Sequence, residues 1–154
     1  MDYLIRPLTK ADEHVLWEML YQALQTSQEA TSREIVRRPE YARYVEGWGR
    51  PGDTGFVAND AKQRDEVLGA VWLRSPVEIK KGEEPMPELA FAVKPNLRKH
   101  GIGAALLTQL VKAYPHNTVS IRAAPNNPAV RLYERFGFKI VKESPSVVIM
   151  RRKA

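Results

Sequence analysis

The sequence predicts an α/β (α+β) domain built on a mixed, mostly antiparallel sheet. Three observations lead to this class. Short apolar runs alternate with amphipathic stretches of helix length, glycine and proline cluster between them, and no segment is repeated. The 154 residues are enough for one domain with a buried core. We therefore expect a single domain over residues 1–154.

The chain begins with a predicted strand at residues 3–7, which a proline ends. Thr9 and Asp12 have the spacing of a capping box, with Asp in place of the usual Glu, and they predict a helix from there to about Leu24. Apolar side chains lie on two faces of this helix. We therefore expect cover on both faces, by protein, by a dimer partner or by a substrate.

The next elements are a second helix, a loop and a hairpin. The helical stretch 32–46 is interrupted at Pro39, because proline lacks the amide hydrogen that a helix interior needs. Four glycines and a proline within residues 47–55 predict a loop. Two apolar runs separated by a polar connection predict a hairpin, at residues 56–58 and 67–73.

The second half reads as strand, helix, strand, helix, strand and strand. The continuous apolar run 89–93 is typical of a buried strand. A helix follows from about Gly101 until Pro115. The remaining strands are expected near residues 118–123, 138–141 and 147–150, with a short helix at 129–136.

Composition excludes several kinds of chemistry. The chain has no cysteine, so disulfides, thiolate nucleophiles and sulfur-ligated metals are excluded. Its three histidines are scattered singly, and we expect no metal site. No apolar run is long enough to cross a bilayer, and the start of the chain does not resemble a signal peptide. We expect a soluble, cytoplasmic protein without membrane contact.

The net charge of +6 is unevenly distributed along the chain. Residues 78–154 hold 14 of the 24 Lys and Arg but only 6 of the 18 Asp and Glu. The stretch 89–133 contains no acidic residue at all. Such a stretch suits an anionic ligand, although a solvated basic surface is the alternative.

A glycine turn lies inside this acid-free stretch. Arg98, Gly101 and Gly103 follow the buried strand and begin the next helix. Uncovered amides at a helix start, together with the helix dipole, favour a phosphate group. The spacing is neither that of a P-loop nor the dinucleotide fingerprint, so a tight structural turn is the alternative. His100 reads as an exposed loop residue.

A second segment follows the next strand. Asn127 can cap a helix, proline suits the first turn, and Gly137 suits the position just past the end. Tyr133 lies on this helix. Its side chain has either a role in a functional site or a place in the apolar core.

The two segments, in this order and at this separation, resemble those of the GNAT superfamily of acetyl-CoA-dependent N-acetyltransferases. The family's first turn matches Arg98, Gly101 and Gly103, and its second segment matches Asn126, Ala129, Tyr133, Gly137 and Phe138. The resemblance covers almost the whole chain. It implies a mixed, mostly antiparallel central sheet of about seven strands, flanked by about four helices.

The resemblance also implies a cofactor site and a reaction. In this fold a bulge splays the buried strand from its neighbour, and acetyl-CoA lies in the gap. Its contacts would come from the following residues: Phe91, Val93, Arg98, Lys99, His100, Gly101, Ile102, Gly103, Ala104, Asn126 and Tyr133. An amine attacks the acetyl carbonyl directly, and Tyr133 would protonate the departing thiolate.

The acceptor side is less defined by the resemblance. Glu88 is the acid beside the cofactor strand, and some members carry a glutamate there as general base, one position farther from the turn. A one-residue offset reverses the face on a strand, so another acid or a water chain is the alternative. The acceptor, a small-molecule or peptide amine, would contact Trp17, Tyr21 and Trp48. Dimers are frequent in the superfamily, so a homodimer is one expected state.

Two other functions compete with this interpretation. A catalytically idle acyl-CoA-binding sensor or scaffold would share the fold and the cofactor site. The basic second half could instead bind nucleic acid, but aromatic side chains do not interleave with its basic residues as stacking surfaces require. We therefore expect no nucleic-acid partner.

Overall fold

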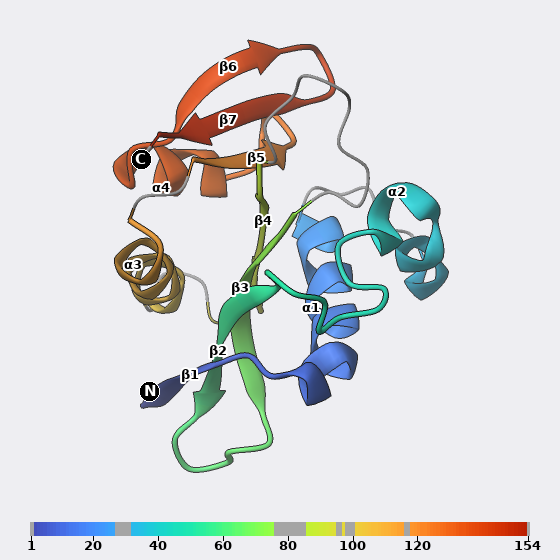
Figure 1. Ribbon diagram of the computed structural model, residues 1–154, viewed down its shortest axis with the longest axis vertical. Coiled ribbons are helices and arrows are strands. Elements are labelled where there is room, and N and C mark those ends of the chain that lie inside the picture. The colour runs from blue at the N-terminus through green and yellow to red at the C-terminus, as the bar shows by residue number, and fades with distance from the viewer. Residues whose placement is uncertain are drawn as a thin grey trace.

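The described chain forms a seven-stranded sheet with helices on both faces (Figure 1). The computed structural model describes residues 2–26, 32–75, 86–94, 97, 101–115 and 118–153. The strand order is β1-β2-β3-β4-β5-β7-β6. Strands β4 and β5 run parallel, and the other neighbouring pairs are antiparallel. This confirms the predicted mixed, mostly antiparallel sheet.

The bounds of the elements agree closely with the sequence prediction. In chain order they are β1 (Tyr3–Pro7), η1 (Lys10–Asp12), α1 (Glu13–Thr26), η2 (Arg33–Arg37), α2 (Pro39–Ala42), β2 (Thr54–Asp60), β3 (Val67–Arg74), β4 (Glu88–Val93), α3 (Ile102–Ala113), β5 (Val119–Ala123), α4 (Ala129–Arg135), β6 (Lys139–Glu143) and β7 (Val148–Arg152). The stretch predicted as one interrupted helix, 32–46, is a 3-10 turn followed by the single-turn helix α2. Pro39 is the first residue of α2, where its missing amide hydrogen costs nothing.

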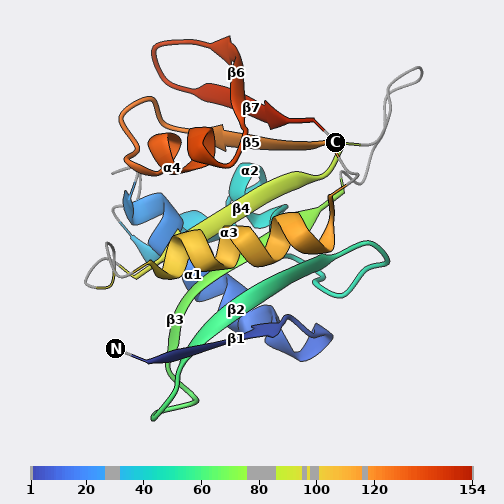
Figure 2. The same ribbon diagram turned by 90° about the vertical axis from the view of Figure 1, so that its left-hand side faces the viewer.

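The sheet separates two apolar layers. Helices α3 and α4 lie on one face, and α1 and α2 lie on the other, which is the rear in Figure 2. Alternate residues of β4 point to opposite layers: Leu89 and Val93 join the α3 side, whereas Ala92 joins the α1 side. Figure 1 also shows the C-terminal strands β5, β7 and β6 together at one end of the molecule.

The protein itself covers the outer face of α1. The Arg37 guanidinium lies 4.0 Å from the ring centre of Trp17, and that of Arg33 lies 4.4 Å from the ring centre of Tyr21. Both arginines come from η2. The chain's own η2 therefore supplies one of the covers that the sequence left open for this helix.

Neither a membrane-spanning helix nor a metal-binding cluster occurs among the described residues. None of the described helices is long and apolar enough to cross a membrane. Within the same ranges, no three or more His, Asp or Glu side chains gather closely enough to hold a metal ion.

The capping box at the start of the first helix is formed as predicted. The Asp12 carboxylate accepts a hydrogen bond from the Thr9 backbone amide at 2.7 Å. It also accepts two from the Arg6 guanidinium, each at 2.9 Å. The Arg6 hydrogen bonds, helped by those from Thr9, lower the pKa of Asp12 from 3.8 to about 2. Folding therefore favours the ionised carboxylate.

Replacing Asp12 with Asn is expected to lower the free energy of unfolding at pH 7 by about 1–2 kcal/mol, a figure reduced because Arg6 is partly solvated. Because the pKa of Asp12 is lower in the folded state, its contribution is complete above about pH 5 and is lost as the pH falls toward 2. Urea titrations from pH 7 to pH 3 should show the difference shrinking. Asp65→Asn, at an exposed site in the β2–β3 hairpin, is the matched control. A difference independent of pH would contradict this assignment.

Candidate active site

The centre of the sheet parts between β4 and β5. These strands pair at only two positions, Glu88 with Ser120 and Leu89 with Ile121. Beyond them, β4 stays with β3 to the end of the strand and β5 stays with β7. The pairing of β4 with β3 has a continuous register from Glu88 to Val93. The bulge that the resemblance implies for β4 is therefore not present in this pairing. The gap opens because each strand follows its outer neighbour.

The open edge of β4 presents backbone groups to this gap. The Lys94 amide donates to the Leu68 carbonyl on β3. Since backbone groups alternate in direction along a strand, those of Phe91 and Val93 point the other way, toward β5. Strand β5 does not pair with them. These are the two positions at which the family resemblance implies contacts with the cofactor.

The start of α3 closes one end of the gap, and its two glycines have different reasons to be there. Gly101 precedes the helix with φ of +80°, a left-handed conformation that favours glycine. At Gly103 a Cβ atom would lie 2.8 Å from the Phe91 ring, so the helix could not approach β4 as closely. Together they leave the first amides of α3 uncovered beside the gap. Arg98, Lys99 and His100 lie outside the described residues.

Tyr133 projects from α4 into the same region. The residue is 4% exposed, and its ring contacts Phe91 edge-on, with ring centres 5.8 Å apart. The Phe138 ring lies on another side, at 6.0 Å. Burial raises the pKa of the Tyr133 phenol. Tyr133 is thus both a core aromatic and a protonated hydroxyl at the cavity wall.

The two asparagines before α4 are placed differently. The Asn127 side chain accepts a hydrogen bond from the Ala129 amide at 2.9 Å, as expected of a helix cap, and it lines the cavity. Asn126 is exposed in the turn and does not line the cavity.

A cavity of about 890 Å³ runs through the gap between the strands. On the α3 and α4 side its lining includes Gly101, Gly103, Ala104 and Tyr133. On the α1 and α2 side the lining comes from helix residues of both elements and from the turn that follows α2. The cavity is therefore lined by residues from both faces of the sheet.

Glu88 lies on the α1 and α2 side, at the start of β4. Its carboxylate accepts a hydrogen bond from the Tyr44 hydroxyl at 2.8 Å and forms an ion pair with Arg43. Arg43 and Tyr44 line the cavity, whereas Glu88 does not. Burial, with the nearby Glu88 charge, raises the pKa of Tyr44. Glu88 is thus connected to the cavity through the Tyr44 hydroxyl group.

The three aromatic residues expected at the acceptor do not line the cavity. Trp17 and Tyr21 lie under the arginines of η2. Trp48 is 4% exposed, and its indole N–H donates to the Thr9 carbonyl at 3.1 Å. This placement does not support an acceptor role for the three. Tyr41, Arg43 and Tyr44 occupy the wall instead.

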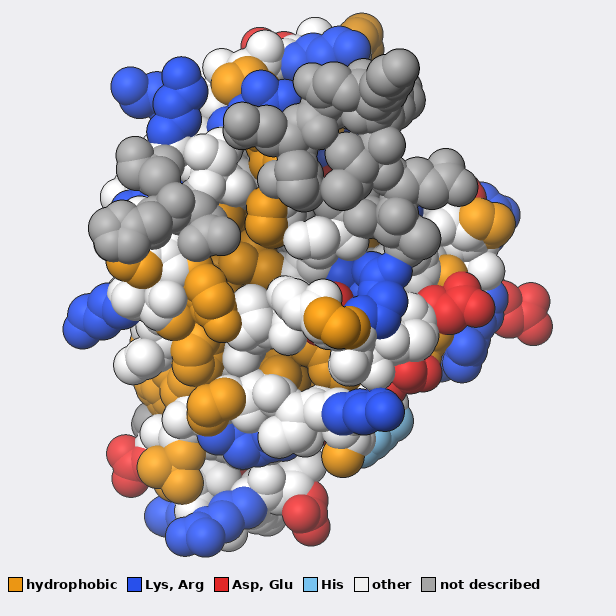
Figure 3. Space-filling model, viewed as in Figure 1, with side chains coloured by type: hydrophobic (Ala, Val, Ile, Leu, Met, Phe, Trp, Pro, Cys, Tyr) orange, Lys and Arg blue, Asp and Glu red, His pale blue; other side chains and the backbone are white. Residues whose placement is uncertain are grey.

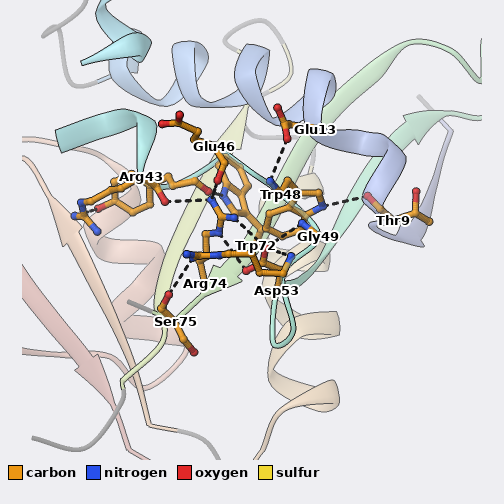
Figure 4. Close-up of polar contacts among 12 residues, drawn as sticks. Thr9, Glu13, Arg43, Glu46, Trp48, Gly49, Asp53, Trp72, Arg74 and Ser75 are labelled. Atoms are coloured by element: carbon orange, nitrogen blue, oxygen red, sulfur yellow. Dashed lines mark hydrogen bonds and ion pairs between the residues drawn. The ribbon is translucent and has the colours of Figure 1, made fainter. Parts of the chain in front are cut away.

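The turn that carries Arg43 and Tyr44 is fixed by buried side chains of β3 (Figure 4). The Arg74 guanidinium donates to the carbonyls of Arg43 and Glu46, at 3.2 and 2.7 Å. The Trp72 indole N–H donates to the Tyr44 carbonyl at 3.0 Å. The wall of the cavity on this side is therefore a preformed surface.

The polar residues of the lining that sequence reasoning missed include Arg43, Tyr44, Arg122 and Arg135. For Arg122 a signal existed, because alternation along residues 119–123 places it opposite two buried apolar side chains. Arg43 and Tyr44 reach the cavity only through contacts with residues far along the chain, and the sequence gives no local sign of them.

The class of protein that this fold and cavity define is the acyl-CoA-dependent acyltransferases, because parted parallel strands over a helix N-terminus can receive a CoA-sized thioester. Residues 17–138 match the family model described as the Acetyltransferase (GNAT) family. The chain belongs to this family and is an acetyl-CoA-dependent N-acetyltransferase. Members of the family acetylate amines.

Solved structures of the family share the fold. The PaiA N-acetyltransferase of Thermoplasma acidophilum, in complex with coenzyme A, is 19% identical over 100% of both chains, with a TM-score of 0.68. A GCN5-related N-acetyltransferase of Ralstonia eutropha is 16% identical, covering 93% of this chain and 96% of that one, with a TM-score of 0.71. A ribosomal-protein-alanine N-acetyltransferase of Brucella melitensis is 22% identical, covering 98% of this chain and 99% of that one, with a TM-score of 0.67. No curated protein matches the chain.

Proposed function

We propose that the protein transfers an acetyl group from acetyl-CoA directly to a primary amine, within a ternary complex of enzyme, acetyl-CoA and acceptor. The observation that carries this proposal is the cavity through the parted strands, which is lined by residues from both faces of the sheet. The chain contains no cysteine, so an acetyl-cysteine intermediate is excluded.

The α3 and α4 side has the chemistry to hold the cofactor. The first amides of α3, from Gly101 to Ala104, suit the pyrophosphate, because Gly101, Gly103 and Ala104 line the cavity. The backbone of Phe91 and Val93 suits the amide groups of the pantetheine arm. Arg98, Lys99, His100 and Asn126 complete the proposed set. When bound, acetyl-CoA supplies the acetyl group as an activated thioester.

Tyr133 is proposed as the general acid. A leaving thiolate needs a proton, and a phenol held at the cavity wall can donate one. The raised pKa of Tyr133 keeps the phenol protonated throughout the working range. Burial also excludes competing water from the same position.

Glu88 is proposed to take up the proton of the amine through Tyr44. The amine would give a proton to the Tyr44 oxygen while the Tyr44 hydroxyl proton moves to the Glu88 carboxylate. The 2.8 Å hydrogen bond between these two groups is already formed. The raised pKa of Tyr44 keeps its hydroxyl proton in place before the reaction.

Replacing Glu88 with Gln is expected to lower kcat at pH 7 by about tenfold or more, because the relay loses its final acceptor. The deficit should shrink as the pH rises, since an amine that is already deprotonated needs no base. Full pH profiles of kcat check this, with Tyr44→Phe as a second interruption of the same relay. An equal deficit at every pH would show a structural role, and unchanged profiles in both variants would favour release of the proton to water.

The proposed function is tested by CoA release from acetyl-CoA in the presence of a panel of primary amines, both small molecules and peptides. Turnover that depends on the amine is the expected result. Tight binding of acetyl-CoA without turnover of any amine would instead support the sensor or scaffold function.

A further inference from the structure

The C-terminal strands carry a basic face that adjoins the cavity. On β5, Val119 and Ile121 are buried in the α3-side core, so Ser120 and Arg122 point to the opposite face. Cross-strand partners share a face, and on β7 these partners are Arg151 and Ile149.

The same pairing continues to the sheet edge. Strand β6 sets Lys139 opposite Arg151 and Lys142 opposite Ile149, whereas Glu143 pairs with Val148 on the other face. The basic face is therefore defined by Arg122, Arg151, Lys139 and Lys142, all of them exposed. Within the described residues none of the four has an acidic partner. Several Lys and Arg side chains are visible at the top of Figure 3, over β6 and β7.

This face opens onto the acceptor side of the cavity. Arg122 lines the cavity, as do Ser146 and Val147 just before β7. Arg122 and Tyr44 line the same cavity, and the Arg122 charge partly offsets the rise in the pKa of the Tyr44 phenol. Arg122 therefore lies near the proposed proton relay. The proposed cofactor contacts from α3 and α4 belong to the opposite layer of the sheet, so the phosphates of CoA do not account for these cations.

The distribution of the cations indicates the kind of ligand. Neighbouring strands lie about 4.8 Å apart, so the basic face extends roughly 10 Å from β5 to β6. A single carboxylate or phosphate occupies only part of that span, whereas an extended peptide, with about 3.3 Å per residue, can place acidic side chains along it. The other outward side chains, Ser120 and Ile149, offer no aromatic surface on which bases could stack.

We propose that the basic face binds an acidic segment of a polypeptide acceptor, whose amine enters the cavity beside Arg122. This inference rests on the proposed function and specifies its substrate class. The acceptor amine belongs to a polypeptide with Asp or Glu residues next to it, and the basic face positions the chain outside the cavity.

The test compares two peptides that each have a free N-terminus and one lysine, followed by either four acidic or four neutral polar residues. The acidic peptide should show about tenfold higher kcat/KM at low salt, and the preference should decline as NaCl is added. The double variant Lys139→Gln/Lys142→Gln, which lies outside the cavity, should lose most of the preference and keep its rate on the neutral peptide. Lys62→Gln/Arg64→Gln, in the exposed β2–β3 hairpin, removes the same charge and should keep the preference.

Binding of a fluorescein-labelled acidic peptide, followed by anisotropy, decides the proposal even without turnover. Absence of turnover with every amine would contradict the proposed function, whereas peptide binding lost in the Lys139/Lys142 variant would still support the basic face. Equal kcat/KM for the two peptides, or a preference that persists in this variant, would overturn the inference. So would inhibition by a single-stranded oligonucleotide in the absence of any preference for the acidic peptide.

Discussion

Replacing Tyr133 with Phe is expected to lower kcat by well over tenfold while leaving the Kd for acetyl-CoA nearly unchanged. General acid catalysis contributes about 10²–10⁴-fold to a rate, and the substitution removes only the hydroxyl group that would supply the proton. The ring contacts with Phe91 and Phe138 are retained, so the core around α4 should not change. Steady-state kinetics and calorimetric titration of acetyl-CoA measure the two quantities.

The Tyr133 result separates catalysis from binding. A rise in Kd that matches the fall in kcat/KM would place the hydroxyl in cofactor binding, and an unchanged kcat would remove Tyr133 from the mechanism. Tyr44→Phe is the matched control, because it also deletes one phenol hydroxyl at the cavity wall. Its deficit should shrink as the pH rises, whereas the deficit of Tyr133→Phe should not depend on amine protonation.

Local signals in the sequence predicted the scaffold of the site well. The change from strand to helix pattern around Gly101 is confirmed, and so are the short helix carrying Tyr133 and its cap at Asn127. These features depend on residues within one or two turns of each other, and such neighbours are visible in a sequence. The structure was needed to explain why each glycine is required. Gly101 adopts a left-handed backbone conformation, whereas a side chain at Gly103 would collide with Phe91.

The acceptor side could not be predicted in the same way. Glu88 meets Arg43 across 45 positions of the chain, and Arg74 meets Asp53 across 21. The hydrophobic periodicity of a sequence does not predict ion pairs between residues so far apart in the chain. The family resemblance implies an acceptor contact for Trp48, but the indole N–H of Trp48 donates to the Thr9 carbonyl inside the fold. An aromatic residue in a loop is informative only once its polar atom has been located.

Arg74 is the buried side chain that fixes this side of the molecule. Its guanidinium donates two hydrogen bonds to the Asp53 carboxylate, both at 3.1 Å, and the two side chains are 4% and 3% exposed. Asp53 also accepts from the amides of Gly49 and Arg50, at 3.0 and 2.9 Å. The pair therefore joins β3 to the loop 47–53, and Arg74 itself also holds the turn with Arg43 and Tyr44.

Arg74→Met is expected to lower the free energy of unfolding by about 3–5 kcal/mol, because it leaves a buried carboxylate without its cation. Adding Asp53→Asn to this variant should restore part of the loss, since the amide side chain carries no charge to bury. A double-mutant cycle measured by urea unfolding gives the coupling, which should be at least about 1 kcal/mol for groups in contact.

Arg74→Lys keeps the charge but cannot reach Asp53 and both carbonyls at once, so it should fold and raise the KM for the amine without changing the Kd for acetyl-CoA. Additive effects of the two substitutions, or an unchanged KM in Arg74→Lys, would show that the ion pair does not hold the wall of the cavity.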